Sequence, residues 1–154
     1  MRMLLLLLML AGTGFNLRAQ PVPVDIRQMP HHYYIGTRQQ LKEGVNCFVL
    51  TDRKQYEEFF GKSDRPDTPK FNKEVMLVLL MPASKKDSKM EFKKVDMKAG
   101  DFIEAYVSLD LYKGKMPYEA YPVATCAIPR YDGVKKVNFY NEKGMKLIQS
   151  VTFK

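Results

Sequence analysis

The chain is poor in the side chains that most enzymes use for catalysis. It has only two histidines, His31 and His32, and only two cysteines, Cys47 and Cys126, in 154 residues. A nucleophilic Ser or Cys needs a base beside it, and adjacent histidines seldom bind one metal without a third ligand. The sequence also lacks G-x-S-x-G, H-E-x-x-H, P-loop and G-x-G-x-x-G motifs. We therefore expect a protein that is not an enzyme, holds no cofactor or metal, and exposes both histidines.

One catalytic alternative stays open at this point, which is an enzyme built on carboxylates. A glycosidase needs two carboxylates on either side of a cleft, and sequence alone cannot show whether two acidic side chains meet in this way. A deep cleft with paired carboxylates would favour this alternative.

Long apolar runs are also missing. The run Met3–Ala11 is about nine residues long, whereas a membrane-spanning helix needs about 20. Arg2 precedes this run and Ala19 follows it, which is the pattern of a secretory signal with a small residue at its cleavage site. We expect residues 1–19 to be a signal peptide and the mature protein to be periplasmic or secreted. No transmembrane segment is expected after signal removal.

Acidic residues are outnumbered by basic ones, and the formal net charge is +8 at pH 7. The lysines are scattered, however, and acidic residues stand among them even in the densest stretch, residues 84–98. This mixing is typical of a solvated basic face, so we expect no nucleic-acid partner.

The two cysteines allow two interpretations. Outside the cytoplasm Cys47 and Cys126 can form a disulfide, which requires that their strands be neighbours or stack face to face. The alternative is that both are small buried apolar residues with free thiols. We expect the bond, or at least two cysteines facing each other in adjacent strands.

Residues 20–44 begin with Pro-Val-Pro-Val and are expected to form an extended leader, and residues 45–154 are expected to form one domain. A strand at Val45–Thr51 precedes a short helix, which Asp52 begins as N-cap and Gly61 ends. The apolar run Val75–Met81 suits a strand buried on both faces. Short connections favour antiparallel neighbours, so the prediction is an α+β fold of mainly antiparallel sheet, with the helix on one side of that sheet. The further expected strands are Met90–Val95, Asp101–Tyr112, Tyr121–Ile128, Val134–Tyr140 and Met145–Phe153.

The connection between two of these strands is a candidate for binding a partner. Residues 112–121 are expected to be a loop that carries Tyr112, Lys115, Met116 and Tyr118. Exposed aromatic and Met side chains are enriched at protein–protein interfaces. The alternative is that Tyr112 and Tyr121 are strand-end residues packed on the sheet.

Several segments resemble the C-terminal domain of the PrcB family of protease-complex subunits. They are a strand that leads into an aromatic helix (residues 48–60), a Pro-Lys-Phe-Asn-Lys-Glu-Val run into a buried strand (residues 69–77), and the strands at residues 121–129 and 136–139. The family's Gly-Gly turn after the buried strand is replaced here by residues 82–89, which contain no glycine. The resemblance implies an exported accessory domain that binds and stabilises a protease. A carbohydrate- or cell-surface-binding envelope module is the alternative, since exposed Tyr and Lys also suit that role.

Overall fold

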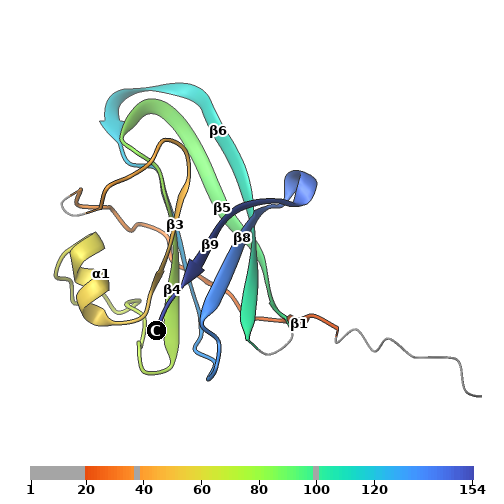
Figure 1. The fold of residues 1–154 in the computed structure, drawn as a ribbon. Coiled ribbons are helices and arrows are strands. Elements are labelled where there is room, and N and C mark those ends of the chain that lie inside the picture. The colour runs from red at the N-terminus through yellow and green to blue at the C-terminus, as the bar shows by residue number, and fades with distance from the viewer. Residues whose placement is uncertain (1–19, 37–38, 99–100) are drawn as a thin grey trace, which may run out of the picture.

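The computed structural model describes residues 20–36, 39–98 and 101–154 of the chain (Figure 1), so the predicted signal peptide lies outside the described residues. Within these ranges there are short and long strands, one α-helix and one turn of 3-10 helix. None of the helices in this part of the chain is long and apolar enough to cross a membrane. The elements are β1 (Val22–Pro23), β2 (Arg27–Gln28), β3 (Asn46–Leu50), α1 (Arg53–Phe60), β4 (Glu74–Leu80), β5 (Ser84–Lys98), β6 (Phe102–Ala120), β7 (Val123–Pro129), β8 (Lys136–Asn141), η1 (Lys143–Met145) and β9 (Lys146–Thr152).

The strands form two sheets rather than the one that we expected. Sheet A has the order β1-β5-β6-β8-β9 and sheet B has the order β2-β7-β4-β3. Every strand pair is antiparallel except β6 and β8, which run parallel. The predicted fold class, an α+β fold of mainly antiparallel sheet with a single short helix, is confirmed.

Strand β4 separates two apolar cores, as its sequence predicts. Side chains alternate across a strand, so Leu77 and Leu79 face the core between the sheets, while Met76 and Val78 face helix α1. None of these four side chains has exposed surface. A continuous apolar run is therefore required here, because both faces of the strand are covered.

Helix α1 begins and ends where the sequence predicts. The Asp52 side chain accepts a hydrogen bond from the Gln55 backbone N–H at 2.9 Å, and Gln55 Oε1 accepts one from the Thr51 N–H at 2.7 Å. Gly61 follows the helix with φ of 79°, a conformation that favours glycine. Tyr56 and Phe59 are buried against sheet B, so the helix forms a third layer on that sheet.

The leader is extended, and several of its residues belong to the core, which the sequence did not lead us to expect. Strand β1 pairs with β5 in sheet A and β2 pairs with β7 in sheet B, so this segment crosses from one sheet to the other. Val24, Met29 and Tyr34 are buried on the way. The leader therefore closes one side of the sandwich rather than lying outside it.

The expected disulfide is wrong, because both cysteines are free and buried. Strand β4 lies between their strands: Cys47 is opposite Leu79 on one side of β4, and Cys126 is opposite Leu77 on the other. Two strand spacings amount to about 10 Å, which exceeds the Cα–Cα limit of about 7 Å for a disulfide. Both thiols are instead packing groups of the core between the sheets.

Candidate functional site

The segment predicted as a binding loop is part of a long two-stranded ribbon. Strand β6 pairs with β8 only over residues 102–107, and beyond that point it pairs with β5 alone. At the far end of this ribbon, β5 connects to β4 and β6 connects to β7, both in sheet B. Residues 84–89 and 110–120 therefore form an arch that carries the chain from one sheet to the other (Figure 1). The prediction of a loop is wrong, since these residues are strand.

Two bulges interrupt strand β6 within the arch. Residues 116–119 lie opposite Lys85 alone, because Lys115 pairs with Lys86 and Ala120 pairs with Ser84. Residues 111–113 likewise lie opposite Ser88 alone. Extra residues in one strand leave the ladder and turn their side chains in new directions, and such bulges are frequent near functional sites.

The bulges hold the exposed tyrosines. Tyr118 is 63% exposed and Tyr112 is 46% exposed. Tyr112 has φ of 59°, a left-handed conformation that bulky residues seldom adopt, and its N–H donates to Ser88 Oγ at 3.0 Å. The structure thus places the four predicted residues, Tyr112, Lys115, Met116 and Tyr118, in or beside the two bulges of one strand.

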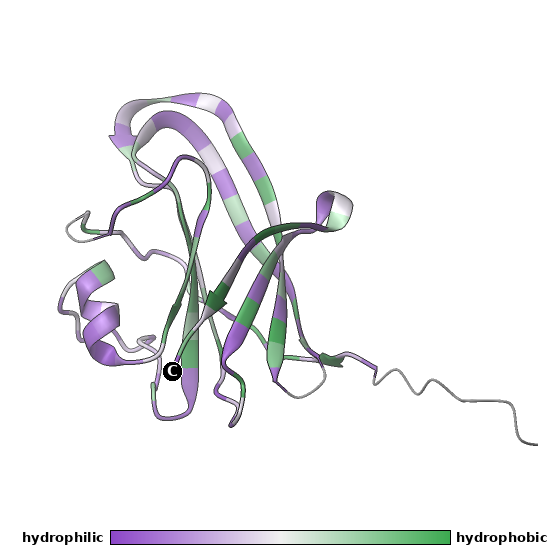
Figure 2. Cartoon of the chain, viewed as in Figure 1, coloured by the Kyte–Doolittle hydropathy of each residue, from purple (hydrophilic) through white to green (hydrophobic). Residues whose placement is uncertain are grey.

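The arch is also rich in charge. Figure 2 shows mostly hydrophilic residues along it, with a few hydrophobic residues between them. The Lys86 ammonium lies 5.6 Å from the centre of the Tyr112 ring, and Lys113 pairs with Asp110 at 3.2 Å. The exposed Tyr112 and Tyr118 rings therefore stand among long charged side chains. Its further lysines are Lys85, Lys89 and Lys115.

A third exposed aromatic residue lies where the arch joins sheet B. The Tyr121 ring packs edge-on against Tyr34, with 5.1 Å between the ring centres, and 38% of Tyr121 is exposed. A side chain at Gly36 would approach the Tyr121 hydroxyl at 3.3 Å, so the leader and the base of the arch are in close contact. The predicted alternative, Tyr121 packed at a strand end, describes this residue.

Two carboxylates lie side by side on the outer face of sheet A. Asp96 and Glu104 are cross-strand partners in β5 and β6. Lys94 pairs with Asp96 at 2.7 Å, and Lys98 pairs with Glu104 at 3.2 Å. Tyr106 donates its hydroxyl to Glu104 at 2.5 Å, and its pKa is raised by burial and by this hydrogen bond. Each carboxylate is thus held by a lysine on the sheet face, which offsets the repulsion between two like charges directly opposite each other.

His32 is buried, which corrects the expectation that both histidines are exposed. Its Nδ1 lies 3.1 Å from the Met29 carbonyl and its Nε2 lies 3.1 Å from the Tyr56 hydroxyl. A carbonyl can only accept, so Nδ1 carries the proton and Nε2 accepts from Tyr56. Burial lowers the pKa of His32. The Nδ1 bond thus lies within the leader, and the Nε2 bond ties the leader to helix α1.

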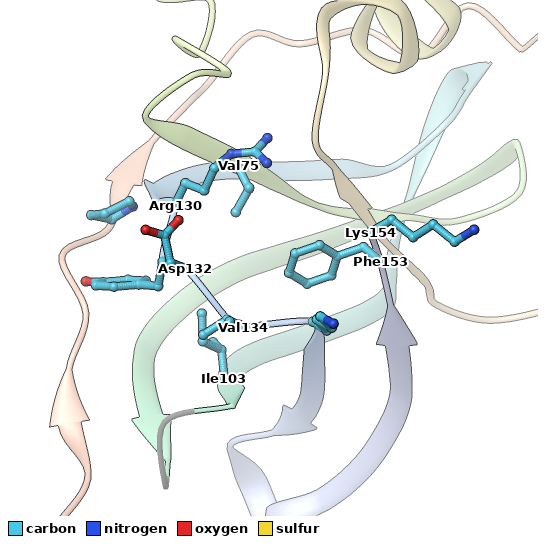
Figure 3. Close-up of a pocket in the computed structure, with 11 residues that line it drawn as sticks. Val75, Ile103, Arg130, Asp132, Val134, Phe153 and Lys154 are labelled. Carbon is cyan, nitrogen blue, oxygen red and sulfur yellow. The ribbon is translucent and has the colours of Figure 1, made fainter.

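A cavity opens between the sheets at the end opposite the arch (Figure 3). We name it the end cavity, and its volume is about 190 Å³. Its walls come from both sheets: Val75 and Ile103 are the second residues of β4 and β6, and Phe153 follows β9. Sequence reasoning missed it because these residues come from distant parts of the chain. The remaining lining residues are Pro129 at the end of β7, residues 130–135 of the β7–β8 connection, and Lys154.

Residues that could hold a metal do not gather anywhere in the described ranges, where no three His, Cys, Asp or Glu side chains form a suitable group. Comparison with known proteins adds no relative: no protein-family model, curated protein or solved structure matches this chain.

Proposed function

We propose that this chain is an exported, non-catalytic accessory domain that binds another protein through the arch. The observation that carries the proposal is the pair of bulges that present Tyr112 and Tyr118 to solvent. Bulges also let strands bend from one sheet to the other, but that role does not require two large rings exposed to solvent. Tyrosine is among the residues that contribute most to binding energy when an interface covers it.

The partner to test first is an exported protease. The resemblance to PrcB motivates this choice, and the segments that carry it are β3 with α1, β4, β7 and β8. They form the framework of the sandwich, whereas the arch lies where the family's Gly-Gly turn is replaced. We propose that the framework is shared with that family and that the arch determines which protein is bound.

The test is a pull-down from native envelopes with the purified protein as bait. We expect a retained protease, identified by mass spectrometry, and loss of at least about tenfold in affinity for the double variant Tyr112→Ser/Tyr118→Ser. The matched control is Met145→Ser/Leu147→Ser, which removes two side chains of comparable exposure at the β8–β9 turn. Equal loss in the control, or retention of a glycan with no protein partner, would contradict the proposal.

A further inference from the structure

The end cavity combines an apolar floor with a basic rim. Val75, Ile103 and Val134 are buried at 2%, 1% and 7% exposure, and the Phe153 ring closes one side (Figure 3). The lining includes Arg130, Lys135 and Lys154, with Asp132 as its one acidic residue, and Figure 3 shows the Lys154 side chain running outward, away from the Phe153 ring. The opening therefore favours a ligand with negative charge around an apolar group.

The rim is held in place by the backbone. Arg130 N–H donates to the Lys73 carbonyl at 2.8 Å, and Phe153 N–H donates to the Lys135 carbonyl at 2.9 Å. The Arg130 guanidinium also donates to the Thr51 carbonyl. Within the residues that the structure describes, neither Lys135 nor Lys154 forms an ion pair, so both ammonium groups are available to a ligand.

The volume of the end cavity limits the size of the group that can bind in it. Pockets for whole small molecules usually measure about 300–1,000 Å³, so 190 Å³ is too small for that class. An apolar cavity of about 150 Å³ binds benzene, so the end cavity has room for one phenyl ring or one branched aliphatic side chain. Anchoring side chains of this kind dominate the energy of many protein interfaces.

We propose that the end cavity receives one apolar side chain, with an aromatic ring as the best fit, from an acidic segment of a partner polypeptide. The apolar group fills the space between Val75, Ile103 and Phe153, and the flanking carboxylates pair with Lys135 and Lys154. This site is independent of the arch, which lies at the opposite end of the sandwich (Figure 1). The domain then has two binding surfaces and can hold two partner segments at once.

The test uses three fluorescein-labelled peptides and the purified protein, with binding followed by fluorescence anisotropy. The first is Asp-Glu-Phe-Glu-Asp, the second has Ala in place of Phe, and the third is Lys-Arg-Phe-Arg-Lys. We expect the first peptide to bind at least about tenfold more tightly than either of the others. Added salt should weaken its binding, since the flanking charges are exposed.

Variants identify the site. Lys135→Glu/Lys154→Glu should weaken the acidic Phe peptide by at least about tenfold, while the control Lys143→Glu/Lys146→Glu, with the same change in charge, should alter it less than about twofold. Methyl NMR signals of Val75, Ile103 and Val134 should shift on binding. The arch variant Tyr112→Ser/Tyr118→Ser should bind the peptide normally, which separates this proposal from the proposed function.

Three results would overturn the inference. The Ala peptide binding as tightly as the Phe peptide would show charge attraction alone. Equal weakening in the control variant would place the binding elsewhere. Competition by 3-phenylpropionate at the affinity of the peptide would indicate a site for a small carboxylic acid instead of a polypeptide.

Discussion

Removing the Tyr56 hydroxyl should lower the free energy of unfolding far more than the small size of the hydroxyl group indicates. Tyr56 is completely buried, and its hydroxyl donates to Nε2 of His32, which is itself only 4% exposed. In Tyr56→Phe that nitrogen stays buried without a partner, which costs about 1–3 kcal/mol. The whole free energy of unfolding of a domain this size is about 5–15 kcal/mol. Urea unfolding, followed by circular dichroism, measures the difference.

The control for this prediction is Tyr140→Phe. Tyr140 is half-buried on the outer face of sheet A, where its hydroxyl can reach water, so the same substitution should change the free energy by less than about 0.5 kcal/mol. The second test is His32→Leu in the Tyr56→Phe background. The Met29 carbonyl keeps its bond from Thr125 Oγ1, so removing both polar partners should recover part of the loss. Equal effects in Tyr56→Phe and Tyr140→Phe would refute the reasoning.

Three further predictions concern acid stability, the thiols and the helix. The free energy of unfolding should fall as the pH drops from about 7 to 5. His32 in the unfolded chain takes up a proton near its ordinary pKa of about 6.5, whereas burial lowers its pKa in the folded protein. Urea midpoints should show this pH dependence, and His32→Leu should weaken it. Ellman's reagent should find no reactive thiol in the native protein, since burial raises the pKa of Cys47 to about 12 and also raises that of Cys126. It should find two thiols in protein that is denatured without a reductant, and finding none there would show a disulfide and disprove the prediction. Asp52→Ala should lower the free energy of unfolding by about 1 kcal/mol through loss of the cap on α1, and an unchanged midpoint would contradict it.

The sequence predicts best those elements that are specified by residues close together in the chain. The cap at Asp52 and the glycine at Gly61 specify helix α1 within a few residues, and the apolar run of β4 can be buried only on both faces. Residues 113–120 of the arch were predicted as loop because both faces of this ribbon are exposed to solvent, so apolar and polar residues do not alternate there. Its residue types still marked it as a candidate surface, although the bulges depend on the pairing register and cannot be derived from one strand.

The burial of leader residues and of His32 could not be predicted, because it depends on segments that lie far away in the sequence. Val24 alternates with Val22 and Ile26, and Tyr34 stands in a short apolar run. These signals are brief and lie in a polar, Pro-containing segment, so the sequence does not show which of them is covered by the sheets. His32 gains its partners from Met29 and from Tyr56 on the helix. The cysteine prediction failed because it required the order of the strands, which several antiparallel topologies leave open.

The leader's crossing from sheet A to sheet B has a consequence for the timing of folding. The N-terminal strands are synthesised first, yet Val22 can pair only once Met97 is present, and Gln28 only once Cys126 is present. The sandwich therefore cannot close while only part of the chain has emerged. In the folded protein, a protease that removed residues 20–29 would take away an edge strand from both sheets at once.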